Sequence, residues 1–257
     1  MLLPFAVAQA PDQQGNKQQA PQAAPPPPQA PFPSNQAPAP EGPVIVLNPA
    51  HGGTDSGARG QNAAMEKDLV LQMARGVKAE LERQGFRVVM TRNDDSNPSY
   101  DDRAAMANGY RDALFISLHI ASTGTVGSVR AYYDQLSTPY VPSDDTESTA
   151  EKAVPPAAVG LHSWNEAQRA YLNSSHRLAD LIQIELAQKF SGSADTALGA
   201  AVRGLRSVAG PAVAIELSSV SAPDPARLAG SAAAPLGDAI ARAVTAFRAA
   251  IPGGAKQ

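Results

Sequence analysis

The chain has 257 residues, a formal net charge of −3 and no cysteine. The lack of cysteine excludes disulfides, zinc-thiolate sites and cysteine nucleophiles, so any metal site must use histidine, aspartate or glutamate. The basic residues are scattered instead of forming a Lys/Arg stripe, which argues against nucleic acid as a partner. We expect one globular domain, because about 200 residues remain after a low-complexity N-terminal segment.

The N-terminal segment has two parts. Residues 1–10, MLLPFAVAQA, combine an apolar run with a small-x-small pattern, as the end of a secretory signal peptide does. No basic segment precedes Leu2, so a merely apolar terminus is the alternative. Residues 11–43 are rich in Pro, Gln and Ala and bury too little apolar surface to fold, which predicts a disordered linker. The signal-like segment favours a periplasmic or secreted protein.

From residue 44 onward, short apolar runs alternate with helical patterns. The runs VIVLN at 44–48 and RVVMT at 87–91 are typical of buried strands. Between them, apolar residues recur at every fourth position: Leu69, Met73, Val77 and Leu81. This spacing predicts a helix from about residue 66 to 84, with Gly85 as its C-terminal stop.

The next stretch continues the alternation. Ser99 and Asp102 have the spacing of a capping box and predict a helix through about Tyr110. LFISLH at 114–119 predicts another buried strand, and VGSVRAYYD at 126–134 predicts the one after it. This order predicts an α/β fold: a single domain with a mostly parallel twisted sheet and helices on both faces.

The second half begins with a break in the pattern. Residues 134–162 are rich in Pro, Ser, Thr and acidic residues and predict a long surface insertion. The insertion is either a solvated loop or a loop that folds over the sheet edge and restricts access. A helix is expected from about residue 163 to 190, then a core strand at 211–217 and a closing helix at 234–249.

Four ionisable residues share one kind of position: His51, Glu66, His119 and Glu216. Each lies at or just past the end of a predicted strand, or at the start of the following helix, where ligands bind in open α/β sheets. Two imidazoles and one carboxylate are the ligand set of catalytic zinc in several hydrolases. A second, unligated carboxylate can take the proton of a bound water and pass it to a leaving amine.

Each of these residues also has a structural interpretation. A histidine at a strand end is often a satisfied structural residue, and Glu66 would interact favourably with the dipole of its helix. Glu216 would equally serve as a structural carboxylate paired with Arg203 or Arg206. Position and residue type alone therefore leave the metal site as one of several interpretations.

Four further residues are not assigned to the chemistry. We expect His162 and His176 to be structural or solvent-facing. Asp55 would either orient a ligand histidine through a hydrogen bond or cap a turn in its glycine-rich loop. A structural salt bridge accounts for Arg103.

Several sequence blocks together resemble a known family across about residues 44–250. The blocks occur in the order NPAHGGTDSGARG (48–60), Glu66-Lys67, TRNDD (91–95), DDRAAMAN (101–108), FISLH (115–119) and IEL (215–217). They resemble the zinc-dependent N-acetylmuramoyl-L-alanine amidases that separate daughter cell walls. We therefore expect residues 44–252 to form an amidase catalytic domain that carries the 134–162 insertion.

The resemblance implies a site and a reaction. It implies that His51, Glu66 and His119 bind one Zn²⁺ ion and that Glu216 is the catalytic carboxylate. The substrate would be peptidoglycan, cleaved at the amide between the lactyl group of N-acetylmuramic acid and L-alanine. We expect a monomer without a membrane span, and the sequence does not disclose whether an activator protein is a further partner. The alternatives are a non-catalytic or regulatory peptidoglycan-binding domain, or a zinc peptidase that cleaves another stem-peptide amide.

The sequence departs from the family pattern at three places, which together include five residues. Ala50 stands where the family has a glycine, which would place a side chain at a position that favours positive φ. Ile120-Ala121 replaces Ala-Asn, and Ser218-Ser219 replaces Gly-Phe. These changes bear on substrate contact, since the four chemical residues are retained.

Overall fold

The structure is a computed structural model that describes residues 44–60, 63–135 and 164–250. The predictions for residues 1–10 and 11–43 lie outside the described residues, as does nearly all of the 134–162 insertion. Within the described part of the chain, no helix is long and apolar enough to cross a membrane.

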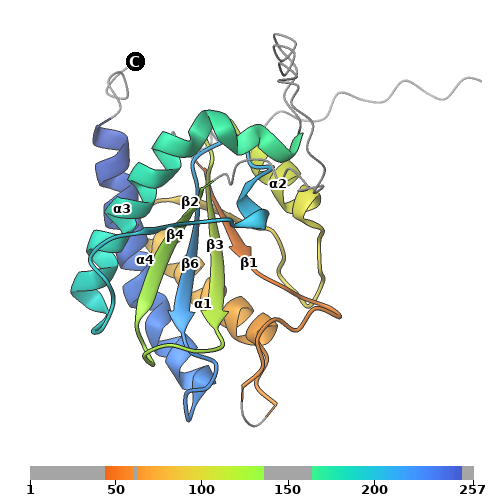
Figure 1. The fold of residues 1–257 in the computed structure, drawn as a ribbon, viewed down its shortest axis with the longest axis vertical. Helices are drawn as coiled ribbons and strands as arrows, with labels where there is room; N and C mark the ends of the chain where they lie inside the picture. Colours follow the sequence, from red (N-terminus) through yellow and green to blue (C-terminus); the bar gives the residue numbers. More distant parts are fainter. Residues whose placement is uncertain (1–43, 61–62, 136–163, 251–257) are drawn as a thin grey trace, which may run out of the picture. The chain divides into compact units, whose positions relative to one another are not determined.

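A six-stranded sheet forms the centre of the fold, in the order β2-β1-β3-β6-β4-β5 (Figure 1). Its strands are β1 (Val44–Pro49), β2 (Arg87–Met90), β3 (Leu114–Ala121), β4 (Val129–Asp134), β5 (Leu198–Ala200) and β6 (Ala212–Ser218). All neighbouring strands are parallel except β4 and β6, which pair antiparallel. The prediction of a mostly parallel sheet is confirmed, and the antiparallel pair makes the sheet mixed at one side.

The described residues also form four α-helices and two 3₁₀ helices. They are α1 (Glu66–Arg83), α2 (Tyr100–Asn108), α3 (Leu172–Lys189), α4 (Pro225–Ala249), η1 (Trp164–Tyr171) and η2 (Arg203–Leu205). The predicted capping box is confirmed, because Ser99 Oγ accepts from the N–H of Asp102 and the Asp102 carboxylate accepts from the N–H of Ser99. The helix expected from about residue 163 begins with η1 and becomes α-helical at Leu172.

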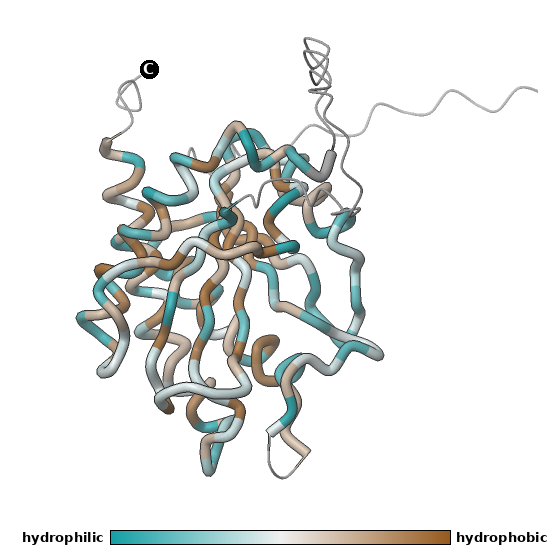
Figure 2. Tube along the Cα trace, viewed as in Figure 1, coloured by the Kyte–Doolittle hydropathy of each residue, from teal (hydrophilic) through white to brown (hydrophobic). Residues whose placement is uncertain are grey.

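One face of the sheet carries the larger hydrophobic core. Side chains that alternate along the strands, such as Ile45, Ile116 and Ile215, pack against α1, α3 and α4. The predicted apolar stripe of α1 is buried in this core, and Figure 2 shows hydrophobic stretches along the central strands. At Gly76 a Cβ would lie only 2.6 Å from the Cβ of Ala233, so glycine permits the close approach of α1 and α4.

The opposite face carries a smaller core. Val46, Phe115 and Ala214 pack there against Ala104 of α2 and Leu205 of η2. The prediction of helices on both faces is therefore confirmed, with the second face covered by shorter elements. Because side chains alternate between faces, the polar side chains near the strand ends project toward this second face.

The start of α4 differs from the sequence prediction. The helix begins at Pro225 instead of residue 234, and the Asp224 carboxylate caps it by accepting from the N–H of Arg227 (2.9 Å). Proline is compatible with a first turn because the N–H that it lacks has no intrahelical partner there. Pro235 lies inside the helix, where proline removes a backbone hydrogen bond, so the pattern alone favoured a later start.

Candidate metal and catalytic site

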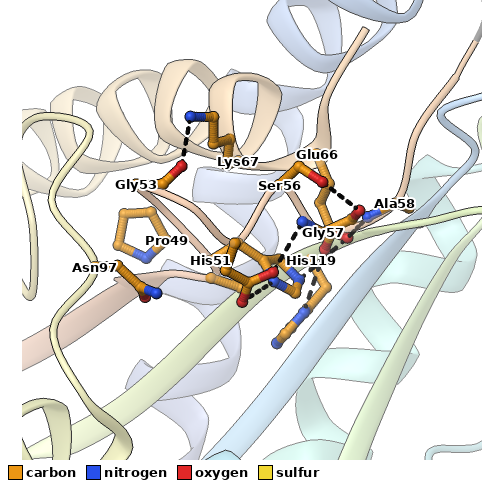
Figure 3. Close-up of polar contacts among 12 residues, drawn as sticks. Pro49, His51, Gly53, Ser56, Gly57, Ala58, Glu66, Lys67, Asn97 and His119 are labelled. Carbon is orange, nitrogen blue, oxygen red and sulfur yellow. Dashed lines mark hydrogen bonds and ion pairs between the residues drawn. The ribbon is translucent and has the colours of Figure 1, made fainter.

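Three of the four predicted site residues converge at one point. His51 follows β1, Glu66 is the first residue of α1, and His119 lies in β3. One ligand atom from each lies within 4.8 Å of the other two, and Figure 3 shows the three side chains pointing toward one another. His51 Nε2 is 3.2 Å from Glu66 Oε2, and His119 Nδ1 is 3.4 Å from Glu66 Oε1. The cluster could hold a metal ion.

Glu66 is buried, with 4% of its surface exposed. Its two carboxylate oxygens accept backbone N–H groups, from Ala58 at 2.8 Å and from Ile120 at 3.0 Å. Burial alone would raise the pKa of this carboxyl, but hydrogen bonds from His119, His51 and the two backbone groups together hold the pKa well below its usual range. Glu66 is therefore ionised at neutral pH.

The loop after β1 has no room for a side chain at Gly57. A Cβ there would lie 2.6 Å from both Glu66 Oε2 and His51 Cδ2, and the residue has φ +61°. The loop also places His51 itself at φ +61°, a conformation that L-residues rarely adopt. The expectation that Ala50 would have positive φ is wrong, because the left-handed residue is the histidine that follows it.

Two buried arginines hold this loop through its backbone. Arg103 donates to the carbonyls of Pro49 and His51, each at 2.9 Å. Arg92 donates to the carbonyls of Pro49 at 2.9 Å and Ala50 at 2.8 Å. The salt bridge expected for Arg103 is absent among the described residues, and the side chain instead fixes the backbone that carries His51.

The outer nitrogen of each histidine has its own partner. Asp55 Oδ2 lies 2.8 Å from His51 Nδ1, and Ser117 Oγ lies 2.9 Å from His119 Nε2. Asp55 also accepts from the N–H of Gly57 at 3.1 Å, so it orients the histidine and stabilises the turn at once. The hydrogen bond to Glu66, and to a smaller extent the one to Asp55, raises the pKa of His51, although burial acts in the opposite direction. The inner nitrogens, with the Glu66 carboxylate, fit the donor set of a zinc site.

Ser117 and Asn48 are functional candidates that the sequence analysis missed. The Asn48 amide donates to Ser117 Oγ at 2.9 Å, and its Oδ1 accepts from Thr91 Oγ1 at 2.7 Å and from Arg103 at 2.6 Å. Arginine has only donors, so this contact sets the orientation of the Asn48 amide. The one available signal was position, since Ser117 lies two residues before His119 on the same face of β3.

Glu216, the fourth predicted residue, lies in β6 beside His119, its register partner in β3. The hydroxyl of Tyr132, in β4, donates to Glu216 Oε2 at 2.9 Å. Burial, followed by the charge of Glu216, raises the pKa of Tyr132 to about 12, so this hydroxyl remains a donor at neutral pH. The sequence alone does not indicate Tyr132, because its contact with Glu216 depends on the pairing of two strands far apart in the chain.

The structural alternative for Glu216 is wrong. Among the described residues, neither Arg203 nor Arg206 forms an ion pair with it. Arg203 lies over the ring of Tyr100, and Arg206 Nε lies 3.9 Å from the Asp134 carboxylate. The carboxylate of Glu216 thus has a tyrosine partner and no arginine partner in the part of the chain that the structure describes.

His176 lies apart from this cluster. His176 is about half exposed, stacks on Tyr133 with ring centroids 4.1 Å apart and lies 3.2 Å from the Asp180 carboxylate. Its predicted structural or solvent-facing role is confirmed. His162 lies outside the described residues.

A cavity of about 300 Å³ opens beside the candidate ligands. Its lining includes His51, Asp55 and His119, together with Tyr100 and Arg203. Fold and site together define an α/β protein with a candidate metal centre in a cleft at the carboxyl edge of its parallel strands.

Comparison with known proteins gives the family. The sequence pattern of the N-acetylmuramoyl-L-alanine amidase family matches residues 45–246. This range is most of the chain, and the chain therefore belongs to that family.

Curated relatives match over shorter segments. N-acetylmuramoyl-L-alanine amidase AmiC of Escherichia coli is 47% identical over 77 residues, which are 30% of this chain and 18% of that protein. The sporulation-specific N-acetylmuramoyl-L-alanine amidase of Bacillus subtilis is 35% identical over 97 residues, which are 37% of this chain and 38% of that protein. The chain thus spans well under half the length of either relative.

Solved structures share the fold. The N-acetylmuramoyl-L-alanine amidase AmiC2 of Nostoc punctiforme has a TM-score of 0.57 at 24% identity, covering 80% of this chain and 96% of that one. The N-acetylmuramoyl-L-alanine amidase from Clostridium difficile 630 has a TM-score of 0.58 at 21% identity, covering 81% and 97%.

Proposed function

We propose that this chain is a zinc-dependent amidase that hydrolyses the bond between the lactyl group of N-acetylmuramic acid and L-alanine in peptidoglycan. The observation that carries the proposal is the convergence of His51, Glu66 and His119 in a cleft, with Glu216 on the neighbouring strand. The family match supports it.

The three converging residues would hold one zinc ion through His51 Nε2, His119 Nδ1 and the Glu66 carboxylate. When bound, zinc supplies a Lewis acid that lowers the pKa of a coordinated water to about 7. Asp55 and Ser117 hold the two imidazoles by their outer nitrogens, which orients each ring so that its inner nitrogen faces the Glu66 carboxylate.

Glu216 would move the proton. Tyr132 donates to Oε2, and among the described residues Oε1 has no hydrogen bond, so Oε1 is the atom available to take a proton from the attacking water. The same carboxyl would return the proton to the amine of L-alanine as the amide bond breaks. Because Tyr132 stays protonated, it orients Glu216 without competing for the proton.

Two other functions fit the same fold. A zinc peptidase would use the same residues on another amide of the stem peptide. A non-catalytic peptidoglycan-binding or regulatory domain would not require a carboxylate held as Glu216 is, so the Tyr132 contact favours an enzyme. We further propose that residues 44–252 form the catalytic domain, that the protein is a monomer, and that it acts in the periplasm or outside the cell.

Digestion of isolated peptidoglycan sacculi tests the reaction. Mass spectrometry of the soluble products should find stem peptides with a free L-alanine amine, together with intact glycan strands. Glu216→Gln, which keeps shape and removes the proton acceptor, should bind zinc and release no peptides above background. New termini inside the stem peptide would replace the amidase by a peptidase, and zinc-loaded protein that releases nothing would support the binding domain.

A further inference from the structure

The cleft at the candidate metal site continues beyond it. A second cavity, of about 310 Å³, shares Ser99, Tyr100 and Arg203 with the first and ends at Arg206 and Ser207. The two cavities therefore adjoin at the start of α2 and at η2, and together they form a groove from the histidines to a pair of arginines, Arg203 and Arg206. The groove is thus open to one side of a substrate whose reacting amide lies at the histidines.

Arg203 is positioned by the ring of Tyr100. Its guanidinium carbon lies 5.2 Å from the ring centroid, and the ring packs against the backbone of η2, where a Cβ on Gly204 would lie 3.4 Å from Tyr100 Cε1. Tyr100 is 50% exposed despite its size, and Arg203 is also exposed. An arginine stacked on an aromatic face keeps the edge of its guanidinium free for a planar anion.

Arg203 is the cation of the groove that is available to a ligand. Among the described residues, the Arg203 side chain forms neither an ion pair nor a hydrogen bond. The two acids that line the groove do not pair with Arg203: Asp55 lies against His51, and Asp101 accepts from the hydroxyl of Ser207 at 3.3 Å. Arg206, deeper in the groove, is partly offset by buried Asp134 at 3.9 Å.

We propose that this groove binds the peptide arm of the substrate and that Arg203 pairs with a carboxylate of that peptide. The proposal rests on the proposed amidase function. The two arms of the substrate differ in charge, because the glycan consists of neutral N-acetyl sugars while a stem peptide with free carboxylates is acidic. A guanidinium pairs with a carboxylate through two parallel hydrogen bonds, so the groove discriminates in favour of the acidic peptide. Arg203 is thus a specificity-determining residue outside the metal cluster.

Matched muramyl peptides test this assignment. One substrate keeps its free carboxylates, and the other, of the same length, has them converted into carboxamides. The wild type should prefer the substrate with free carboxylates. Arg203→Ala should lower kcat/KM for that substrate about tenfold, mainly through a higher KM, and should change kcat/KM for the carboxamide substrate little. Arg203→Lys should keep part of the preference. Arg111→Ala is the control, because that side chain is 97% exposed and lines neither cavity.

An equal loss on both substrates with Arg203→Ala would make the residue structural, and no loss on either would remove it from the site. Calorimetric titration of the protein with the free stem peptide, once with free carboxylates and once with carboxamides, measures binding without turnover. If the wild type cleaves neither substrate but binds the acid through Arg203, the amidase function fails and the subsite stands. If both substrates are cleaved at the same rate and the carboxylate and carboxamide peptides bind equally, the amidase function is supported and the proposed Arg203 subsite is contradicted.

Discussion

Replacement of Ser117 by alanine tests how the candidate ligands are held. The hydroxyl of Ser117 is the partner of His119 Nε2 at 2.9 Å and accepts from the Asn48 amide at 2.9 Å. Both contacts are lost in Ser117→Ala, and the buried Asn48 donor is left without its partner. Loss of such an outer partner typically weakens a metal site about 10- to 100-fold. An unsatisfied buried donor costs about 1–3 kcal/mol of stability.

The assay is a competition titration with a zinc chelator of known affinity, accompanied by urea unfolding. Ser175→Ala is the matched control, because Ser175 is also fully buried and accepts from the N–H of Ala212 at 3.0 Å, away from the cluster. The control should lose comparable stability and keep wild-type zinc affinity. If Ser117→Ala binds zinc as tightly as the wild type, then the hydroxyl does not orient His119 and the argument for the outer partners fails.

Three further changes have defined outcomes. Tyr132→Phe should lower kcat about tenfold in the sacculus assay at unchanged KM, because Glu216 loses its partner; an unchanged kcat would contradict the role. Gly57→Ala should lose zinc in metal analysis while keeping its circular dichroism, since the new Cβ meets the ligands; full zinc content would refute this. Hydrogen bonds from Lys189 and others lower the pKa of Asp238 to about 2, so its stabilisation is present above about pH 4 and is lost as pH falls toward 2. With solvent screening, Asp238→Asn should cost about 1 kcal/mol in urea unfolding at pH 7 and almost nothing at pH 2, and equal losses would contradict the linkage.

The elements that could be predicted correctly from the sequence are those with a regular spacing of hydrophobic residues. The four-residue spacing from Leu69 to Leu81 needs only one buried helix face, so it predicts α1 without knowledge of the sheet. Strand β5 has three residues and no alternation, and it lies at the sheet edge, so nothing local indicates it. The start of α4 was misplaced because packing retains Pro235 inside the helix against its local preference.

The candidate site likewise contains residues that the sequence indicates and residues that only the structure indicates. The ends of β1 and β3 and the start of α1 lie at one edge of the sheet, so position and residue type make His51, Glu66 and His119 candidates, and the family resemblance implied their role as zinc ligands. The contacts that hold them depend on tertiary pairing: Ser117 with Asn48 across β3 and β1, and Tyr132 with Glu216 across an antiparallel pair. A single sequence gives no indication of which polar neighbours meet in this way.

Zinc content and stem-peptide release, measured in the same samples of wild type and Glu216→Gln, test the central claim most directly. The account predicts one zinc ion per chain in both proteins, and release of peptides with a free L-alanine amine by the wild type only. Release at the wild-type rate by zinc-loaded Glu216→Gln, or by wild-type protein stripped of metal, would contradict it.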